Sequence, residues 1–131
     1  MKISTDSKNL LDTNILIEAF RGTEPTASLV KKWIKEGNIA ISVITVAEFL
    51  VNANKEEKEK LSLVLTKFAP LAVEQTIAEI AAEYRREYSR KSKRVYLIDC
   101  LIAATAKLYN LTLVTKDTKD YPMKDIKIIN P

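Results

Sequence analysis

Histidine is absent from this chain of 131 residues, and only one cysteine, Cys100, occurs. Without histidine, Ser-His-Asp and Cys-His nucleophiles, histidine general bases and histidine metal sites are excluded. A single cysteine excludes an internal disulfide and a thiolate cluster, and it fits a reducing compartment. Any enzymatic chemistry must therefore come from carboxylates, hydroxyls, lysines or arginines, or from hard metal ions held by oxygen ligands.

Glycine and long apolar runs are also scarce. The two glycines, Gly22 and Gly37, cannot build a G-x-G-x-x-G or Walker loop for phosphates. No apolar run approaches the roughly 20 residues that span a bilayer. Residues 1–8 lack the apolar stretch of a secretory signal, and we expect them to be flexible or peripheral. We expect a cytoplasmic protein.

The composition is that of a globular protein, with 47% apolar and 29% charged residues. The length suits one domain with one core, so we expect a single domain over residues 1–131. The net charge of +4 and the isoelectric point near 9.1 are compatible with a nucleic-acid partner but do not require one.

Short apolar runs alternate with helical patterns along the chain. The expected strands cover 9–13, 39–43, 70–73, 111–115 and 126–129. The expected helices cover 15–20, 25–36, 61–68 and 98–109, and two more begin at Thr45 and Thr76. The helix over 98–109 is apolar nearly all round, which indicates a buried central helix. This alternation predicts an α/β fold with a mainly parallel sheet.

Four acids lie at strand ends or in apolar surroundings, unlike the other acids of the chain. Asp12 ends the first strand, Glu48 follows the second, Asp99 begins the central helix, and Asp117 follows the strand over 111–115, with Asp120 three residues on. Strand ends and the helix N-termini that follow them share one edge of a parallel sheet. We therefore expect these acids on one edge, although the strand order decides whether they meet.

Each acid also has a plainer explanation. Asp12 and Asp99 could be helix N-caps, Thr45-x-x-Glu48 matches a capping box, and Asp117 and Asp120 could be turn residues. If the acids converge, however, they repel one another, by roughly 4 kcal/mol for two carboxylates about 4 Å apart at an effective dielectric near 20. Such a cluster needs protons or a divalent cation, and oxygen ligands suit Mg²⁺ or Mn²⁺. An ion there would activate a water for attack on a phosphoryl group.

Four segments together resemble the PIN domain, and most of all the VapC-type ribonuclease toxins of toxin–antitoxin pairs. They are Leu-Leu-Asp-Thr-Asn at 10–14, Val-Ala-Glu-Phe-Leu at 46–50, Ile-Asp-Cys-Leu-Ile-Ala-Ala-Thr-Ala at 98–106 and Leu-Val-Thr-Lys-Asp-Thr-Lys-Asp-Tyr at 113–121. The resemblance implies a three-layer α/β/α sandwich with a mainly parallel five-stranded sheet. It also implies Mg²⁺- or Mn²⁺-dependent cleavage of RNA, a homodimer, and inhibition by a small antitoxin.

The same resemblance assigns roles to single residues. Asp12, Glu48 and Asp99 match the catalytic, metal-binding acids of the family. Asp117 is the favoured fourth acid, and Asp120 is a second metal-binding candidate beside it. Thr13 and Asn14 match a polar pair, with Asn14 orienting the first acid or contacting substrate; alternatively, both are helix-cap residues.

A basic stretch precedes Asp99 and includes Arg85, Arg90 and Arg94. These arginines could bind RNA phosphates near the metal site, or they could be a solvated helix end. Two other functions stay open. One is a PIN nuclease that works in RNA processing without an antitoxin, and the other is a non-catalytic module that binds RNA or protein.

Overall fold

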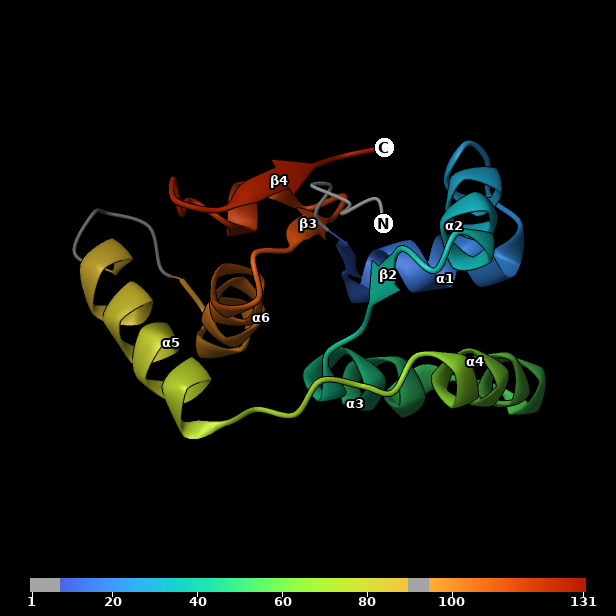
Figure 1. The fold of residues 1–131 in the computed structure, drawn as a ribbon, viewed down its shortest axis with the longest axis horizontal. Helices are drawn as coiled ribbons and strands as arrows, with labels where there is room; N and C mark the ends of the chain where they lie inside the picture. Colours follow the sequence, from blue (N-terminus) through green and yellow to red (C-terminus); the bar gives the residue numbers. More distant parts are fainter. Residues whose placement is uncertain (1–7, 90–94) are drawn as a thin grey trace, which may run out of the picture.

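The computed structural model describes residues 8–89 and 95–131, in which four strands form one parallel sheet (Figure 1). The strands are β1 (Asn9–Leu11), β2 (Ile39–Ala40), β3 (Thr112–Val114) and β4 (Lys127–Ile129), in the order β2-β1-β3-β4. Every neighbouring pair is parallel. The predicted α/β class is confirmed. The expected N-terminal segment lies outside the described residues except for Lys8.

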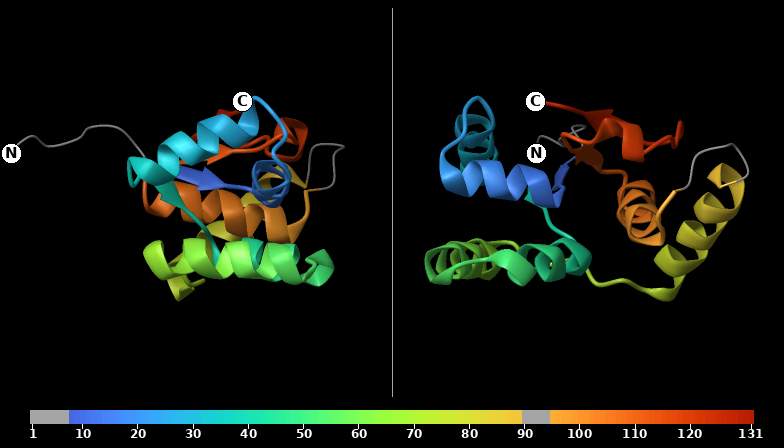
Figure 2. Two further views of the ribbon diagram at one scale, coloured as in Figure 1. Left: turned by 90° about the vertical axis from the view of Figure 1, so that its right-hand side faces the viewer. Right: turned by 180° about the vertical axis from the view of Figure 1, so that it is seen from behind.

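The helices cover both faces of this sheet. They are α1 (Thr13–Arg21), α2 (Thr26–Lys35), α3 (Val43–Asn52), α4 (Lys55–Lys67), α5 (Gln75–Tyr88) and α6 (Leu97–Leu108). Figures 1 and 2 show α5 and α6 together on one side of the molecule and α1, α2 and α4 on the other. No helix within the described ranges is long and apolar enough to cross a membrane.

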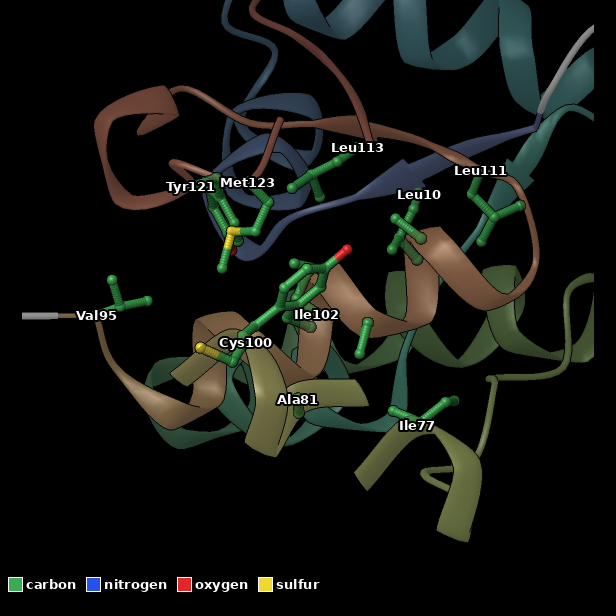
Figure 3. Packing of buried hydrophobic residues seen from close by; sticks show 14 residues of the cluster. Leu10, Ile77, Ala81, Val95, Cys100, Ile102, Leu111, Leu113, Tyr121 and Met123 are labelled. Atoms are coloured by element: carbon green, nitrogen blue, oxygen red, sulfur yellow. The ribbon is translucent and has the colours of Figure 1, made fainter. Parts of the chain in front are cut away.

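Side chains along β1 point alternately to the two faces of the sheet, and the core is accordingly divided into two clusters. Leu10 pairs with Leu113 in the parallel register, and both side chains pack with α5 and α6 (Figure 3). Leu11 pairs with Val114, and both pack against the helices of the opposite face. Successive strand residues point to opposite faces, so two adjacent leucines serve two cores. The result is the expected three-layer arrangement.

The predicted strand over 70–73 is reduced to one bridge. Leu71 pairs in parallel with Ser42, and its N–H donates to the Ile41 carbonyl at 2.8 Å. Pro70 has no N–H to donate, so the ladder does not extend toward it. Among the described residues the sheet therefore has four strands and a single-residue bridge instead of the expected five strands.

Helices α3 and α4 begin at Val43 and Lys55, earlier than the expected starts at Thr45 and Leu61. Helix α3 begins at Val43, and Ser42 is its N-cap, with its hydroxyl accepting from the Ile44 N–H at 3.1 Å. Thr45 is therefore inside the helix, and the capping-box alternative for Thr45 and Glu48 is wrong. The capping box lies at α4, where Asn54 and Glu57 each accept from the other's backbone N–H.

The strand order leaves room at one place along the carboxyl edge of the sheet. From β1 the chain passes to β2 on one side, and later returns to β3 on the other side. Ligands of open α/β sheets bind where neighbouring connections diverge in this way. Here that place is the carboxyl end of β1 and β3, where Asp12 and Thr115 follow the strands.

Candidate active site

Asp12 is the buried acid at this position. It follows β1 directly, is 7% exposed, and its N–H donates to the Val114 carbonyl of β3 at 3.0 Å. It is also the N-cap of α1, because its Oδ1 accepts from the Thr13 N–H at 2.9 Å. Its other oxygen, Oδ2, accepts from the Thr115 hydroxyl at 2.8 Å and from the Tyr121 hydroxyl at 3.0 Å. The cap and site interpretations are therefore compatible, since each uses a different oxygen.

Asp99 reaches the same place from α6. It lies in the first turn of that helix, whose N-cap is Tyr96, so the N-cap alternative for Asp99 is wrong. Its Oδ1 lies 3.4 Å from the Tyr121 hydroxyl oxygen. Partial burial, and then the negative charges of Asp120, Asp12 and Glu48, raise the pKa of Asp99 to about 6, and the Tyr121 hydroxyl opposes this shift.

Glu48 approaches from α3. Its side chain is exposed, and its Oε1 accepts from the Thr13 hydroxyl at 2.8 Å. Since Ser42 caps α3, the Glu48 carboxylate is not engaged at the helix start. Its charge also contributes to the raised pKa of Asp99, which places it with Asp12 around the same point.

The two C-terminal acids differ in their surroundings. Asp117 is exposed, and its Oδ2 accepts from the Asn14 amide at 3.0 Å. Asp120 is half-buried at the end of the 3₁₀-helix η1 (Thr118–Asp120), and its charge is the largest electrostatic influence on the pKa of Asp99. Asp117 is not among the largest influences on this pKa. The structure thus brings Asp120 to the cluster and leaves Asp117 at its edge.

Thr13 and Asn14 orient acids and do not cap a helix. They are the first two residues of α1, after the Asp12 cap, so the cap alternative for them is wrong. Thr13 holds Glu48, as described above. The Asn14 side chain accepts from the Lys116 N–H at 3.1 Å and donates to Asp117, which connects α1 with the segment after β3.

The basic stretch is described only in part. Arg85 is half-buried on α5, and its Nε donates to the Ser89 hydroxyl at 3.1 Å. Its charge partly offsets the effect of burial, which raises the pKa of the Cys100 thiol to about 11. Arg85 therefore lies near Cys100, in the first turn of α6. Arg90 and Arg94 lie outside the described residues.

Two buried hydroxyls of the site, those of Thr115 and Tyr121, were not predicted. The sequence predicts Thr115 as the last residue of a strand and places Tyr121 at the end of a motif. The sequence held one weak signal, a tyrosine next to an acid in a polar turn. Burial raises the pKa of Tyr121 far above its ordinary value, and the charges of Asp12 and Asp99 raise it further, so its hydroxyl stays protonated.

The charge of this acid cluster is not balanced by described cations. The ion pairs in the described ranges involve other acids, namely Glu18, Glu56, Glu57 and Asp125. As the side chains stand, no three acids within those ranges are arranged to hold one metal ion. The donor set nevertheless consists of oxygens alone, which are the ligands that Mg²⁺ and Mn²⁺ prefer. Binding an ion would require the carboxylates to draw closer together.

Comparison with known protein families identifies the family of this chain. The PIN domain model matches residues 10–127. The chain belongs to the PIN domain family. The predicted family is confirmed.

Named relatives place this PIN protein among the VapC-type toxins. It is 32% identical over 114 residues to ribonuclease VapC10 of Mycobacterium tuberculosis, covering 87% of this chain and 86% of that protein. It is also 32% identical to toxin FitB of Neisseria gonorrhoeae, covering 93% and 96%. VapBC2 of Rickettsia felis, solved on a promoter DNA fragment, superposes with a TM-score of 0.78 at 26% identity, covering 94% and 98%.

Proposed function

We propose that this VapC-type PIN protein is a metal-dependent endoribonuclease, the toxin of a toxin–antitoxin pair. Relatives that are 32% identical carry the names ribonuclease and toxin. One observation of the structure carries the proposal. Asp12 and Asp99 both lie within hydrogen-bond distance of the Tyr121 hydroxyl. The negative charges of Glu48 and Asp120 also raise the pKa of Asp99.

Asp12, Glu48, Asp99 and Asp120 would hold one or two Mg²⁺ or Mn²⁺ ions. Ribonucleases of this family are typically metal-dependent. A bound ion supplies a Lewis acid that lowers the pKa of a water and stabilises negative charge on the phosphoryl oxygens. The chain's own acids provide the negative field that attracts the cation, and Asp12, the most buried of them, fixes where it binds.

The sequence and the electrostatics of the structure favour different residues as the fourth metal-binding acid. The sequence favours Asp117, whereas the influence on the pKa of Asp99 favours Asp120. We therefore assign metal binding to Asp120. Asp117, exposed and held by Asn14, is the better candidate for orienting substrate at the edge of the site.

Thr13 and Asn14 would act through the acids that they bind. Thr13 orients Glu48, and Asn14 orients Asp117 and the backbone of Lys116. Arg85 would bind an RNA phosphate, since it lies on α5 near the start of α6. For Arg90 and Arg94, phosphate binding remains a proposal from the sequence alone.

An apolar groove away from the acid site is our candidate surface for an antitoxin. A groove of about 770 Å³ lies between α1, α2 and α4, with Phe20, Val30, Ile34, Leu63 and Val64 among its lining residues. Leu63 is 72% exposed. An apolar groove between helices suits the apolar face of a partner helix. The homodimer, the single domain and the cytoplasmic location expected from the sequence remain proposals as well.

Cleavage of a mixed RNA pool by the purified chain tests the proposed function. Cleavage should require Mg²⁺ or Mn²⁺, stop in EDTA, and fall by at least about 100-fold in Asp99→Asn, which removes one ligand charge. Asp125→Asn is the matched control, because Asp125 binds Tyr84 and Lys107 outside the cluster.

The outcomes separate the alternatives. Activity that survives EDTA, or that survives in Asp99→Asn, contradicts the metal mechanism. If the antitoxin-free chain cleaves no RNA in either metal, the non-catalytic binding module becomes the better function. A small open reading frame beside the gene distinguishes a toxin from an RNA-processing nuclease that has no antitoxin.

A further inference from the structure

Tyr121 is a buried tyrosine whose hydroxyl lies between two acids of the site. Its side chain is 4% exposed, and its ring belongs to the apolar cluster on the α5–α6 side of the sheet, beside Met123 (Figure 3). The hydroxyl leaves this cluster toward the carboxyl edge of the sheet. There it lies 3.0 Å from Asp12 Oδ2 and 3.4 Å from Asp99 Oδ1.

Core packing explains the ring of Tyr121 but not its hydroxyl. A phenylalanine would fill the same apolar space, whereas a buried hydroxyl is unfavourable unless it has a hydrogen-bond partner. The partners of this hydroxyl in the described structure are Asp12 and Asp99. The two acids come from different elements, one after β1 and the other in α6.

We propose that Tyr121 is a positioning residue whose hydroxyl keeps Asp12 and Asp99 facing one point, from which a divalent cation would draw them together. This inference rests on the metal site of the proposed function. Two like-charged carboxylates repel and tend to turn away from each other when no cation is present. The Tyr121 hydroxyl has one proton, which it donates to Asp12 at 3.0 Å and which, at the longer distance of 3.4 Å, points only weakly toward Asp99. This positive end of the O–H dipole between the two acids opposes their repulsion, so the ion meets acids that are already partly ordered.

Thr115 adds a second restraint, but only on one of the two acids. Its hydroxyl donates to Asp12 Oδ2 and is not bonded to Asp99. Loss of the Tyr121 hydroxyl would therefore leave Asp12 oriented by Thr115, while Asp99 would lose its connection to Asp12. The predicted defect is a weaker site with an intact fold.

Tyr121→Phe tests this role, and Tyr84→Phe is its matched control. Tyr84 is also buried in the α5–α6 cluster, and its hydroxyl also donates to an aspartate, Asp125, at 2.8 Å. Titration calorimetry of the RNA-free protein with Mn²⁺ should show affinity about 10-fold weaker in Tyr121→Phe and unchanged in Tyr84→Phe. Thermal unfolding in EDTA should show both variants folded.

Cleavage at varied Mn²⁺ concentration gives a second readout. The half-maximal Mn²⁺ concentration of Tyr121→Phe should rise by about 10-fold, while its rate at saturating Mn²⁺ approaches that of the wild type. Unchanged Mn²⁺ affinity in Tyr121→Phe, with binding intact in the wild type, overturns the positioning role alone. A wild-type protein that binds no Mn²⁺ overturns both this role and the proposed metal site.

If Tyr121→Phe does not fold, the wild-type protein answers the question. Tyrosine labelled with ¹³C at Cζ reports on each hydroxyl by NMR, and Tyr84→Phe assigns the Tyr84 signal. Mg²⁺ should shift the resonance of the buried Tyr121 and leave that of Tyr84 in place. A Tyr121 signal that Mg²⁺ at saturation does not move contradicts the proposal.

Discussion

At the scale of single residues, Asp12 shows how one side chain meets a structural and a chemical demand together. Oδ1 caps α1, and Oδ2 accepts two hydroxyl groups from the segment after β3. Three donors hold a carboxylate that is only 7% exposed, which offsets much of the desolvation it suffers. The cap fixes the orientation of the acid before any ligand arrives.

Asp99 should make the metal-free protein less stable as the pH rises. Its pKa in the folded protein is about 6, above the ordinary value of 3.8, so the folded state binds the proton more tightly. Stability is therefore lost between about pH 4 and pH 6. In EDTA at pH 7, Asp99→Asn should stabilise the protein by about 1 kcal/mol, a figure discounted because the carboxyl group is half exposed to solvent.

Thermal unfolding in EDTA at pH 4.5 and pH 7 measures this effect. The melting temperature of Asp99→Asn should exceed that of the wild type by a few degrees at pH 7, and the gap should narrow at pH 4.5. Asp117→Asn, which alters an exposed acid outside the cluster, is the control. A gap of equal size at both pH values would contradict the raised pKa of Asp99.

The fourth acid can be identified by comparing two conservative variants. Asp120→Asn should lower the RNA cleavage rate by about 10- to 100-fold, because the Asp120 charge acts on the cluster around Asp99. Asp117→Asn should lower it by less than about 10-fold, since its amide can still accept from Asn14. Rates at saturating RNA and Mn²⁺ decide between them, and the reverse ranking would restore Asp117 as the ligand.

At the scale of elements, the caps of α3 and α4 decide which acids are available. Ser42 caps α3, so Glu48 lies within the helix with a free carboxylate that reaches Thr13. Glu57 performs the structural task that the capping-box alternative assigned to Glu48, because it completes the capping box of α4. The two glutamates have similar local sequence patterns but different roles.

Asn54→Ala should destabilise the protein by about 1 kcal/mol, since it removes the side-chain acceptor for the Glu57 N–H at the start of α4. RNA cleavage at a temperature well below unfolding should not change. Urea unfolding monitored by Trp33 fluorescence measures the stability. Ser62→Ala, at an exposed position within α4, is the control, and a loss of equal size there would rule out the cap as the cause.

At the scale of the whole molecule, the sheet holds the site between two cores. Leu10 and Leu113 anchor β1 and β3 to the α5–α6 side, and Leu11 and Val114 anchor the same strands to the opposite side. The residues that follow these strands, Asp12 and Thr115, are therefore fixed from both faces. The acids repel one another but stay together at this edge because the two close-packed core clusters hold β1 and β3 in place.

Metal ions should stabilise the folded chain at pH 7. An ion that binds only the folded state at 100 times its dissociation constant adds about 2.7 kcal/mol. Mn²⁺ should therefore raise the melting temperature by several degrees, and by less at pH 5, where protonated Asp99 competes with the ion. Scanning calorimetry measures this shift; an equal shift in Asp99→Asn would place the bound metal elsewhere.

Local features of the sequence determined the fold class and most of the acids of the candidate site. The apolar pair Leu10-Leu11, followed by Asp12, predicted a buried strand ending in an acid, and Gly22 ends α1 in the left-handed conformation where the sequence placed its end. The lack of histidine limited the chemistry to oxygen ligands. These rules work because strand alternation, helix caps and composition depend on residues close together along the chain.

Only the tertiary structure decided which groups meet Asp12. Thr115 and Tyr121 bond to it across 103 and 109 residues of sequence, and no local pattern encodes such contacts. They depend on β3 lying beside β1, which is a matter of strand order. The same packing brings Asp120 toward Asp99 and leaves Asp117 with Asn14, because long-range contacts follow from how the elements pack and not from the preferences of each element alone.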